Sequence, residues 1–495
     1  MARTIKARRA PAWPCAPTTD LPAKEVADVL VQNYFKISES MYRILHIPSF
    51  RSDYEALWVS NSPPSMAFVM QLKLVLALGA VTFDELFSMR SLAVHWVYEA
   101  HSWVSEPKFK SRLDIQSLQT QLLLLIAQEK VGVSGDPMWI SIGALIRKAT
   151  FMGVHRDPTH LRPRTVFAAE MRRRLWNTIL ELALQSSLNC GGPVLLGLSD
   201  FDSAPHQNFD DDQLVSDEST PKPEDEFTQS SVSIALRKTF PQRLAVVRFL
   251  NDIASAGKYE EALQLDAQLR QSYKSLVKTL QNHKRSNSSA APSQYEHRAV
   301  DVLIHRFLAA LHIPYFSLAI KGTEYAFSRK VVVDSSVRIW NAVFPPDGKK
   351  EDDLTKLAVC SSGFYPVLMN HSALLVTVEL HALLAEEEGL SPTPLRPDLL
   401  AILNNALPWC HKLIEAGETN IKGYILTTLL ATHLEASRLG LSMEDKGAML
   451  VQAASKTVQT CMPILQGMIE ALGSEPDDPM QQPFEELEDW GFMVS

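Results

Sequence analysis

The chain has few cysteines, and none of them are clustered. Its 495 residues contain only five, and neighbouring ones are at least 50 positions apart: Cys15, Cys190, Cys360, Cys410 and Cys461. A metal site encoded locally in sequence needs pairs such as Cys-x-x-Cys, so no such site is predicted. The odd number and wide spacing are typical of a reducing compartment, the cytosol or the nucleus. All five are therefore interpreted as isolated buried thiols.

Long apolar runs and an excess of positive charge are also missing. No run reaches the roughly 18 residues that a membrane-spanning helix needs. The stretch 72–81 contains Lys73, which favours a buried core helix, and no membrane association is expected. The net charge of −8 excludes a nucleic-acid-binding surface covering the whole chain, because such proteins carry a basic patch or domain.

Motifs of catalytic sites are absent as well. The 14 histidines form no HxxxH or HExxH, and the sequence holds no GxSxG elbow and no GxxxxGK[ST] phosphate loop. His155-Arg156-Asp157 matches the start of a kinase catalytic loop, but Arg162 stands where the metal-binding Asn belongs and no Asp-Phe-Gly follows. We therefore interpret the triplet as a structural turn and predict that the protein is not an enzyme.

What the chain does contain is helical periodicity, because apolar residues recur every three or four positions through most of its length. The predicted fold is all-α, an irregular multi-helix array with disordered termini and loops, built as one extended helical region or two packed halves. The clearest predicted helices are 66–79, 81–105, 114–130, 242–253, 259–280, 298–311, 328–343, 362–384, 398–416, 424–439 and 446–472.

Four segments lack this periodicity. Residues 1–20 carry Arg3, Lys6, Arg8 and Arg9 followed by prolines, and their composition predicts a disordered tail. A nuclear-localisation signal and a mitochondrial presequence are alternative readings of this tail. The other three segments are predicted to be mobile loops rich in turn-forming and charged residues: 210–231, 283–293 and 344–353.

The segment 138–214 predicts two amphipathic helices, a tight turn and an acidic loop. The second helix contains a run of three arginines followed by two large apolar residues: Arg172, Arg173, Arg174, Leu175 and Trp176. Successive helical residues turn by about 100°, so the three arginines fan over roughly 200° and cannot all face one phosphate track. A structural role in salt bridges is therefore preferred to DNA contact, with Glu170 four residues before Arg174 as an intrahelical partner.

A stop and an acidic stretch follow this helix. Gly191-Gly192-Pro193 predicts a turn, because glycine tolerates positive φ and proline cannot continue a helix. The acidic residues after the turn are predicted to form a solvated loop: Asp200, Asp202, Asp210, Asp211 and Asp212.

The C-terminal segment 474–495 differs in kind from the rest. It contains seven acidic residues, no basic residue, and bulky side chains that include Phe484, Leu487, Trp490 and Phe492. Acidic residues keep such a segment solvated while its aromatic side chains remain available to a partner groove. The composition predicts an amphipathic disordered activation segment. Folding on binding would present Phe484, Leu487 and Trp490 at helical offsets. The alternative is a tail docked on the protein's own core.

These motifs together resemble the fungal-specific transcription factor domain, the helical regulatory region that follows the zinc cluster in Zn2Cys6 transcription factors. The resemblance rests on the signature 138–214 and covers about residues 21–340, and the helical remainder is compatible with it. It implies a regulatory domain over 21–473. The chain departs from the family pattern in two places. Asn177 follows Trp176 where the family commonly has a second Trp, and Ala183-Leu184 stand where an Asp-Arg pair is usual.

The resemblance implies a nuclear regulator of transcription that controls a metabolic or secondary-metabolite gene set. Its expected partners are the transcription machinery or a coactivator, and a second copy or a zinc-cluster factor in a dimer. Zinc is the family's cofactor, but its six clustered cysteine ligands are absent, so zinc-dependent DNA binding is not carried over. The alternatives are a sensor or scaffold protein that does not bind DNA, or the truncated product of a gene for a zinc-cluster factor.

Overall fold

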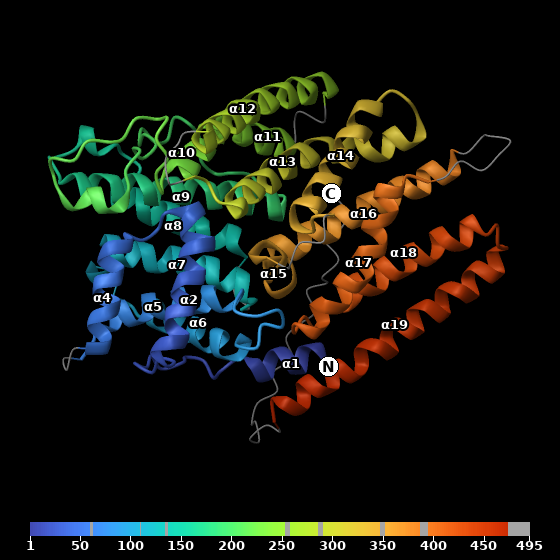
Figure 1. Ribbon diagram of the computed structural model, residues 1–495, viewed down its shortest axis with the longest axis horizontal. Coiled ribbons are helices and arrows are strands. Elements are labelled where there is room, and N and C mark those ends of the chain that lie inside the picture. The colour runs from blue at the N-terminus through green and yellow to red at the C-terminus, as the bar shows by residue number, and fades with distance from the viewer. Residues whose placement is uncertain are drawn as a thin grey trace. The chain divides into compact units, whose positions relative to one another are not determined.

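In a computed structural model of the chain, the regular secondary structure is helical (Figure 1). The structure describes residues 1–59, 63–108, 110–133, 137–252, 258–285, 291–346, 352–386 and 395–473. Within these ranges no β-strand occurs, and the all-α prediction is confirmed. The helices differ widely in length and are not related by a repeat, as expected for an irregular array.

The described chain divides into two compact units. The signature unit consists of Ala12–Phe83 and Leu92–Phe307, and the terminal unit consists of Met1–Pro11, Asp84–Ser91 and the described residues from Leu308 onward. Each unit therefore combines segments that are far apart in the sequence. The boundary near residue 307 falls inside one long helix, α13 (Gln294–Lys321).

The signature unit contains most of the shorter helices. They are α2 (Lys24–Tyr34), α3 (Ser40–Tyr42), α4 (Ile47–Val59), α5 (Met66–Ala80), α6 (Arg90–Ser105), α7 (Ile115–Val131), α8 (Met138–Phe151), α9 (Val166–Cys190), α10 (Ser231–Lys238), α11 (Phe240–Asn251) and α12 (Tyr259–Arg285). Single helical turns lie between them at Phe35–Glu39, Lys110–Arg112, Pro158–His160 and Asp211–Val215.

Helix α5 is the core of the N-terminal half of this unit. Every residue from Phe68 to Ala80 is buried, as expected for a helix that is apolar on all sides. It packs against α2 and α7. The backbones of α2 and α5 approach so closely at Gly79 that a Cβ atom there would lie 1.9 Å from the carbonyl oxygen of Leu30.

The one charged residue of α5 is neutralised inside the core. Lys73 is 1% exposed and forms an ion pair with Glu99 of α6, which is fully buried. Thr18 completes the group, because its hydroxyl accepts from Lys73 Nζ (2.8 Å) and donates to Glu99 Oε1 (2.6 Å). A buried ammonium ion needs such partners to offset the loss of its hydration.

The N-terminal residues are packed, which corrects the prediction of a disordered tail over 1–20. Ala2–Arg9 form α1, with Ile5 fully buried in the terminal unit. Residues 12–20 lie in the signature unit, where the backbone N–H of Cys15 donates to Ser102 Oγ (2.8 Å). Composition predicted disorder because the segment is rich in basic residues and prolines, and contacts with distant helices override it.

The predicted helix over 81–105 is also corrected, because its first turns are a separate loop. Asp84 accepts hydrogen bonds from the N–H groups of Leu86 (2.9 Å) and Ser88 (3.1 Å), and Phe87 has a φ of +50°. An aspartate that binds its own following backbone competes with helix formation. Helix α6 therefore begins only at Arg90.

The terminal unit holds longer helices. They are α14 (Ala326–Val343), α15 (Asp353–Cys360), α16 (Phe364–Ala385), α17 (Pro397–Glu415), α18 (Lys422–Arg438) and α19 (Met443–Ala471), together with α1 and the end of α13. α13 and α16 are long and apolar enough to cross a membrane by length and composition, but 61% and 50% of their most apolar windows are buried inside the protein. Burial in a helical core accounts for this composition.

The approach of α2 to α5 provides a test of the packing. Gly79→Ala should lower the free energy of unfolding of the signature unit by about 1–3 kcal/mol or more, because the methyl group has no room. Denaturant titration followed by circular dichroism measures this. Gly143→Ala in α8 is the matched control, since its Cβ meets only Arg147 Nη1 at 3.6 Å and should change stability by no more than about 1 kcal/mol. Equal effects of the two substitutions would contradict the packing.

Candidate functional site

The candidate site is built around α9, the helix that carries the arginine run. Thr165 caps its N-terminus by accepting from the N–H of Ala168 (3.1 Å). The helix ends at Cys190, followed by Gly191 with a φ of +64°. All three arginines are buried, with Arg174 fully so. Buried guanidinium groups need hydrogen-bonded partners, and α9 finds them in segments on several sides.

Each arginine of the run binds a different segment, as the rotation of about 100° per residue requires. Arg172 donates to the carbonyl oxygen of Met152, at the C-terminus of α8 (2.6 Å). Arg173 forms ion pairs with Asp157 (2.7 Å) and Glu170 (2.6 Å). The predicted partner of Glu170 was Arg174, but the i,i+3 spacing to Arg173 is the one that forms.

The His155-Arg156-Asp157 triplet is the turn that Arg173 holds. Asp157 accepts two bonds from Arg173 (2.7 and 3.0 Å) and one from the N–H of Ala204 (3.0 Å). It also accepts from the N–H of Thr159 (3.0 Å) and so caps the helical turn Pro158–His160. Burial alone raises the pKa of Asp157, but these hydrogen bonds outweigh it and hold the pKa well below its ordinary value. A carboxylate so saturated is an anchor and not a general base.

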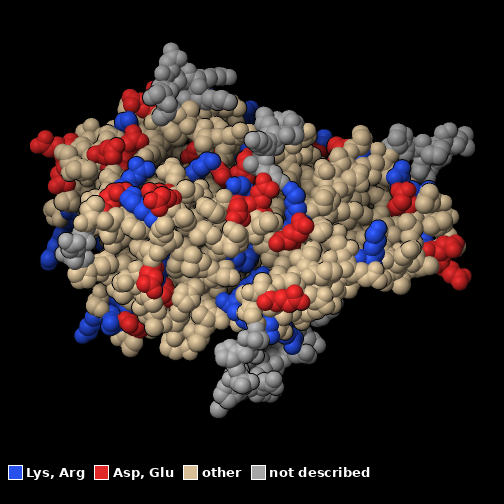
Figure 2. Space-filling view, turned by 60° about the horizontal axis from the view of Figure 1, so that its bottom comes forward, with Lys and Arg blue, Asp and Glu red and all other residues tan. Residues whose placement is uncertain are grey.

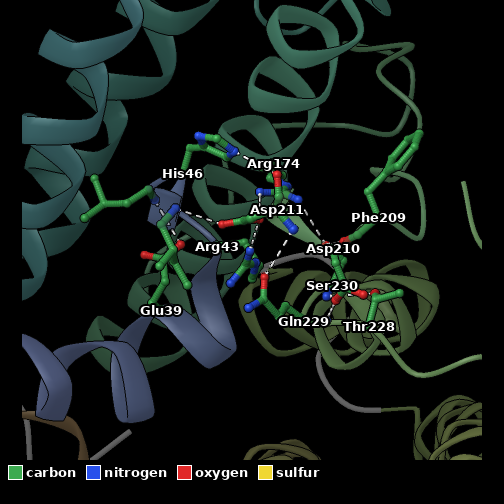
Figure 3. Close-up of polar contacts among 12 residues, drawn as sticks. Glu39, Arg43, His46, Arg174, Phe209, Asp210, Asp211, Thr228, Gln229 and Ser230 are labelled. Atoms are coloured by element: carbon green, nitrogen blue, oxygen red, sulfur yellow. Dashed lines mark hydrogen bonds and ion pairs between the residues drawn. The ribbon is translucent and has the colours of Figure 1, made fainter. Parts of the chain in front are cut away.

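Arg174 takes part in the most deeply buried group of charges, shown in Figure 3. Its Nη1 donates to Asp211 Oδ1 (2.7 Å), and Arg43 forms a second ion pair with the same carboxylate. The other carboxylate oxygen accepts from the N–H of Ile47 (2.8 Å), and His46 donates to the carbonyl oxygen of Asp211 (2.9 Å). One aspartate thus joins α9 to the segment around residues 43–47.

The position of Asp211 corrects the prediction that all five acidic residues lie in a solvated loop. Asp211 is 1% exposed. Burial raises its pKa, but the guanidinium groups of Arg43 and Arg174 outweigh this effect and lower the pKa to about 2. Asp211 therefore stays ionised above pH 4 and supplies one negative charge between two positive ones.

The loop that carries Asp211 is held by polar contacts, in contrast to the mobile loop predicted for 210–231. Asn208 donates to the carbonyl oxygens of Pro223 (2.7 Å) and Glu226 (2.9 Å), and its own side-chain oxygen accepts from Thr228 (2.7 Å). Ser230 donates to the carbonyl oxygen of Phe209 (3.0 Å) and is fully buried. Serine and threonine, which composition associates with linkers, here satisfy buried backbone groups.

Glu39 lies beside this cluster and was not predicted. It is fully buried and accepts from Tyr34 Oη (2.7 Å) and from the N–H of Leu45 (2.9 Å). Burial raises its pKa to about 7, against the opposing effect of Arg43, and the negative charge of Asp211 adds to the rise. Of the two neighbouring carboxyl groups, Asp211 is ionised and Glu39 is the one that can hold a proton near neutral pH.

A third buried ion pair connects α9 with α11. Glu181 and Arg243 bind through two parallel hydrogen bonds (2.7 and 2.8 Å), and Gln185 donates to the same carboxylate (2.8 Å). Sequence reasoning missed both charges. The available signal was a single charged residue within an otherwise apolar helical segment, ILELAL around Glu181 and RLAVV at Arg243.

The turn Gly191-Gly192-Pro193 lies directly after α9 and packs on α8. A Cβ at Gly192 would lie 2.8 Å from Trp139 Cε2, and Trp139 Nε1 donates to the carbonyl oxygen of Pro193 (3.1 Å). Leu175 and Trp176 of α9 are buried. The rings of Trp176 and Phe201 meet edge to face, with their centroids 5.8 Å apart. The turn and the two apolar residues therefore serve packing between helices.

The serine–histidine pair of this site, Ser233 and His206, is enclosed. Ser233 and His206 approach to 2.8 Å, but both are 2% exposed, and Ser233 donates its proton to the carbonyl oxygen of Ser230 (2.9 Å). Burial and the positive charges of Arg174 and Arg43 hold the pKa of His206 well below its ordinary value. This histidine is therefore neutral and enclosed, and the pair is explained by packing of α10.

The cysteines do not fit the zinc cluster that the resemblance implies. Among the described residues, no three His, Cys, Asp or Glu side chains lie close enough to hold a metal ion. Cys360 points toward the carbonyl oxygens of Asp84 and Glu85, and Cys461 lies in an apolar cluster. Burial raises the pKa of the Cys410 thiol to about 12, and the nearby Cys461 adds to the rise. Two thiols alone do not supply the four ligands of a structural zinc site. Phe484, Leu487, Trp490 and Phe492 lie outside the described residues.

Comparison with known proteins identifies a family for this architecture. Residues 31–290 match the model of the fungal specific transcription factor domain. The match begins in α2 and includes all of α9 with its buried partners Arg43, Asp157 and Asp211. No solved structure matches the chain.

Three curated relatives resemble between 56% and 93% of the chain. The transcription factor lepE of Aspergillus flavus is 31% identical over 481 residues, which cover 93% of this chain and 57% of that protein. The transcription factor opdR of Penicillium oxalicum is 33% identical over 397 residues, covering 77% of this chain and 50% of that protein. The aspyridones cluster regulator apdR of Emericella nidulans is 32% identical over 290 residues, covering 56% and 39%. The chain therefore corresponds to about half the length of these relatives.

The Asp211 cluster predicts a large loss of stability when its single acid is removed. Asp211→Asn keeps the shape but leaves Arg43 and Arg174 buried without a counter-charge, and should cost about 3–5 kcal/mol of unfolding free energy. Lys222→Ala, which breaks the partly exposed pair with Asp210, should cost less than about 1 kcal/mol. Denaturant unfolding of both variants measures the contrast. Equal losses would show that Asp211 is not the centre of the network.

Glu39 predicts a pH dependence of stability. Its pKa in the folded protein is about 7, above its ordinary value of 4.5, so folding favours the protonated form. Its stabilising contribution is present below pH 4.5 and is lost as the pH rises through 7. Glu39→Gln, which imitates the protonated acid, should flatten this decline in unfolding measured between pH 5 and 7.5. Glu25→Gln, on the exposed face of α2, controls for the loss of one carboxylate and should keep the wild-type slope.

Proposed function

The chain belongs to the family of the fungal-specific transcription factor domain, and from this premise we propose that it regulates transcription of a metabolic or secondary-metabolite gene set without catalysing a reaction. One of its relatives is named a cluster regulator and two are named transcription factors. The proposal assigns the regulation of transcription to this chain as well.

The observation that supports it best is that the family match, 31–290, lies within the signature unit except for residues 84–91, and that it contains the buried charges of α9. Those charges connect α9 to the segment at 43–47, the turn at Asp157 and the loop at Asp211. A network of this kind stiffens a scaffold and offers no reactive group to a substrate. The signature unit is thus suited to presenting surfaces to other proteins.

We propose that the chain regulates transcription through contacts with other proteins. The segment 474–495 recruits the transcription machinery or a coactivator through Phe484, Leu487, Trp490 and Phe492, and the helical body pairs with a second copy or with a zinc-cluster factor. The protein acts in the nucleus. On the face shown in Figure 2, the described Lys and Arg side chains lie among Asp and Glu side chains rather than in a band of one sign. Such a face is not suited to tracking a phosphate backbone, so DNA contact is not assigned to it.

A reporter assay tests this proposal. The full chain fused to a heterologous DNA-binding domain should activate a reporter gene, and replacing Phe484, Leu487 and Trp490 together with alanine should reduce activation about tenfold, because apolar anchors supply most of the binding energy in such contacts. The control replaces Met480, Gln481 and Gln482 with alanine in the same segment and should retain activation. A fusion that activates equally without the three bulky residues would refute the assignment of an activating segment.

A further inference from the structure

A basic helix, α1, packs beside the C-terminal end of α19. Helix α1 (Ala2–Arg9) carries four basic residues among its eight. A helix this short is not stable alone in water. It is held by Ile5, which is fully buried in a cluster with Ile414, Cys461 and Leu465. Because Cys461 and Leu465 belong to α19, this cluster fixes α1 beside the last turns of that helix.

Two basic side chains of α1 donate to backbone carbonyl oxygens. Arg8 donates to the carbonyl oxygen of Ile469 (3.2 Å), and Arg9 donates to that of Gly417 (2.7 Å). Both carbonyl groups lie at the C-terminal ends of helices, α19 and α17, where the helix dipole favours cations. Carbonyl groups orient a guanidinium group but do not neutralise its charge. One carboxylate, that of Glu418, lies near Arg9 and offsets part of the positive charge of α1. Lys6 is exposed on the same helix.

An apolar rim adjoins these charges. Met468 and Leu472, in the last turn of α19 and just after it, are only partly buried, as is Ile464 one turn earlier, and all three pack against the cluster around Ile5. We use the term α1 surface for Lys6, Arg8, Arg9, Met468 and Leu472. It combines positive charge with accessible apolar area, which is the complement of an acidic segment with bulky side chains.

Such a segment follows immediately in the chain. Helix α19 ends at Ala471, and residues 474–495 contain seven acidic residues, no basic ones and the bulky residues named above. The eleven residues that follow Gly473, up to Phe484, can span at most about 40 Å when extended. That is ample for a return to α1, whose eight residues are about 12 Å long.

We propose that the α1 surface is a docking site for the chain's own segment 474–495 and that docking hides Phe484, Leu487 and Trp490 from partners. The proposal rests on the proposed function in one respect, because hiding these residues has a regulatory consequence only if they recruit a partner. The contact itself does not depend on that function.

Segment 474–495 belongs to the same chain as the α1 surface, and this covalent connection favours it over a separate molecule as the occupant. A segment that is joined to its binding site by only about ten residues has an effective concentration on the order of 1 mM there. A dissociation constant of about 0.1 mM would then leave the segment docked roughly nine-tenths of the time. A coactivator with micromolar affinity could still displace it, so the docked state is a restraint that a partner can overcome. A second copy at micromolar concentration cannot match the effective concentration of the linked segment.

Carbodiimide cross-linking of the full chain tests the contact, because it joins a lysine amine to a carboxylate only when the two touch. At about 1 μM protein, where encounters between copies are rare relative to the linked segment, carboxylates of 474–495 should join Lys6. The matched control is Lys456, an exposed lysine of α19 that lies about 22 Å before the end of the helix. Peptide mapping should give at least about tenfold more product at Lys6 than at Lys456.

The salt dependence and a charge reversal complete the test. The preference for Lys6 should disappear in 1 M NaCl, where the screening length falls to about 3 Å. In the Lys6→Glu variant, chymotryptic cleavage after Phe484, Leu487 and Trp490 should accelerate about fivefold, whereas Lys456→Glu should leave the rate unchanged. Equal cross-linking at both lysines, or cross-links only between two copies, would overturn the proposal.

The reporter assay separates this inference from the proposed function. If the segment activates and also docks, Lys6→Glu should increase activation by the full chain. If cross-linking to Lys6 is found while reporter output is unchanged both by Lys6→Glu and by the triple alanine substitution at Phe484, Leu487 and Trp490, the docking stands and the activating role fails. If the segment activates but no preference for Lys6 is found, the docking fails and the activating role stands.

Discussion

The structure of the signature unit depends on one buried carboxylate. Asp211 lies between Arg43 and Arg174, and all three side chains are at most 2% exposed. Two guanidinium groups cannot be buried side by side without a counter-charge, since the cost of desolvating each ion is several kcal/mol. The position of α9 relative to the N-terminal helices, and the path of the loop 208–231, are both set by the need to bring this carboxylate to the two arginines.

The remaining buried charges extend the same constraint along α9. Arg173 with Asp157, and Glu181 with Arg243, place a further turn and a further helix against it. Ion pairs of this kind contribute little net stability compared with apolar packing, but they penalise any arrangement in which a partner is missing. We infer that they select one relative placement of these segments. That specificity suits a domain whose function is to hold surfaces in defined positions.

The arginines near α1 are held differently from those at the centre of the signature unit. Arg43, Arg173, Arg174 and Arg243 face carboxylates in the interior. In the terminal unit Arg8, Arg9 and Arg90 donate to backbone carbonyl oxygens at the ends of α15, α17 and α19. Burial lowers the pKa of Arg90 to about 10, and the positive charge of Arg9 adds to this effect. The carboxylate of Glu418 opposes this effect and offsets one of these positive charges. A net positive charge therefore remains near α1, and the acidic segment 474–495 complements it.

The sequence by itself determined the helical class, most helix positions and the family, because each depends on local periodicity or on a contiguous motif. Helices α7, α14, α16 and α17 were predicted within two residues of their observed ends. α10 and α15 were missed, since eight residues are too few to show a helical period. Only the tertiary structure decided which charges are buried. Asp211 and Asp212 are adjacent and chemically alike, yet one is enclosed between two arginines and the other is not. The difference arises from segments more than 30 residues away, and no local pattern carries that information.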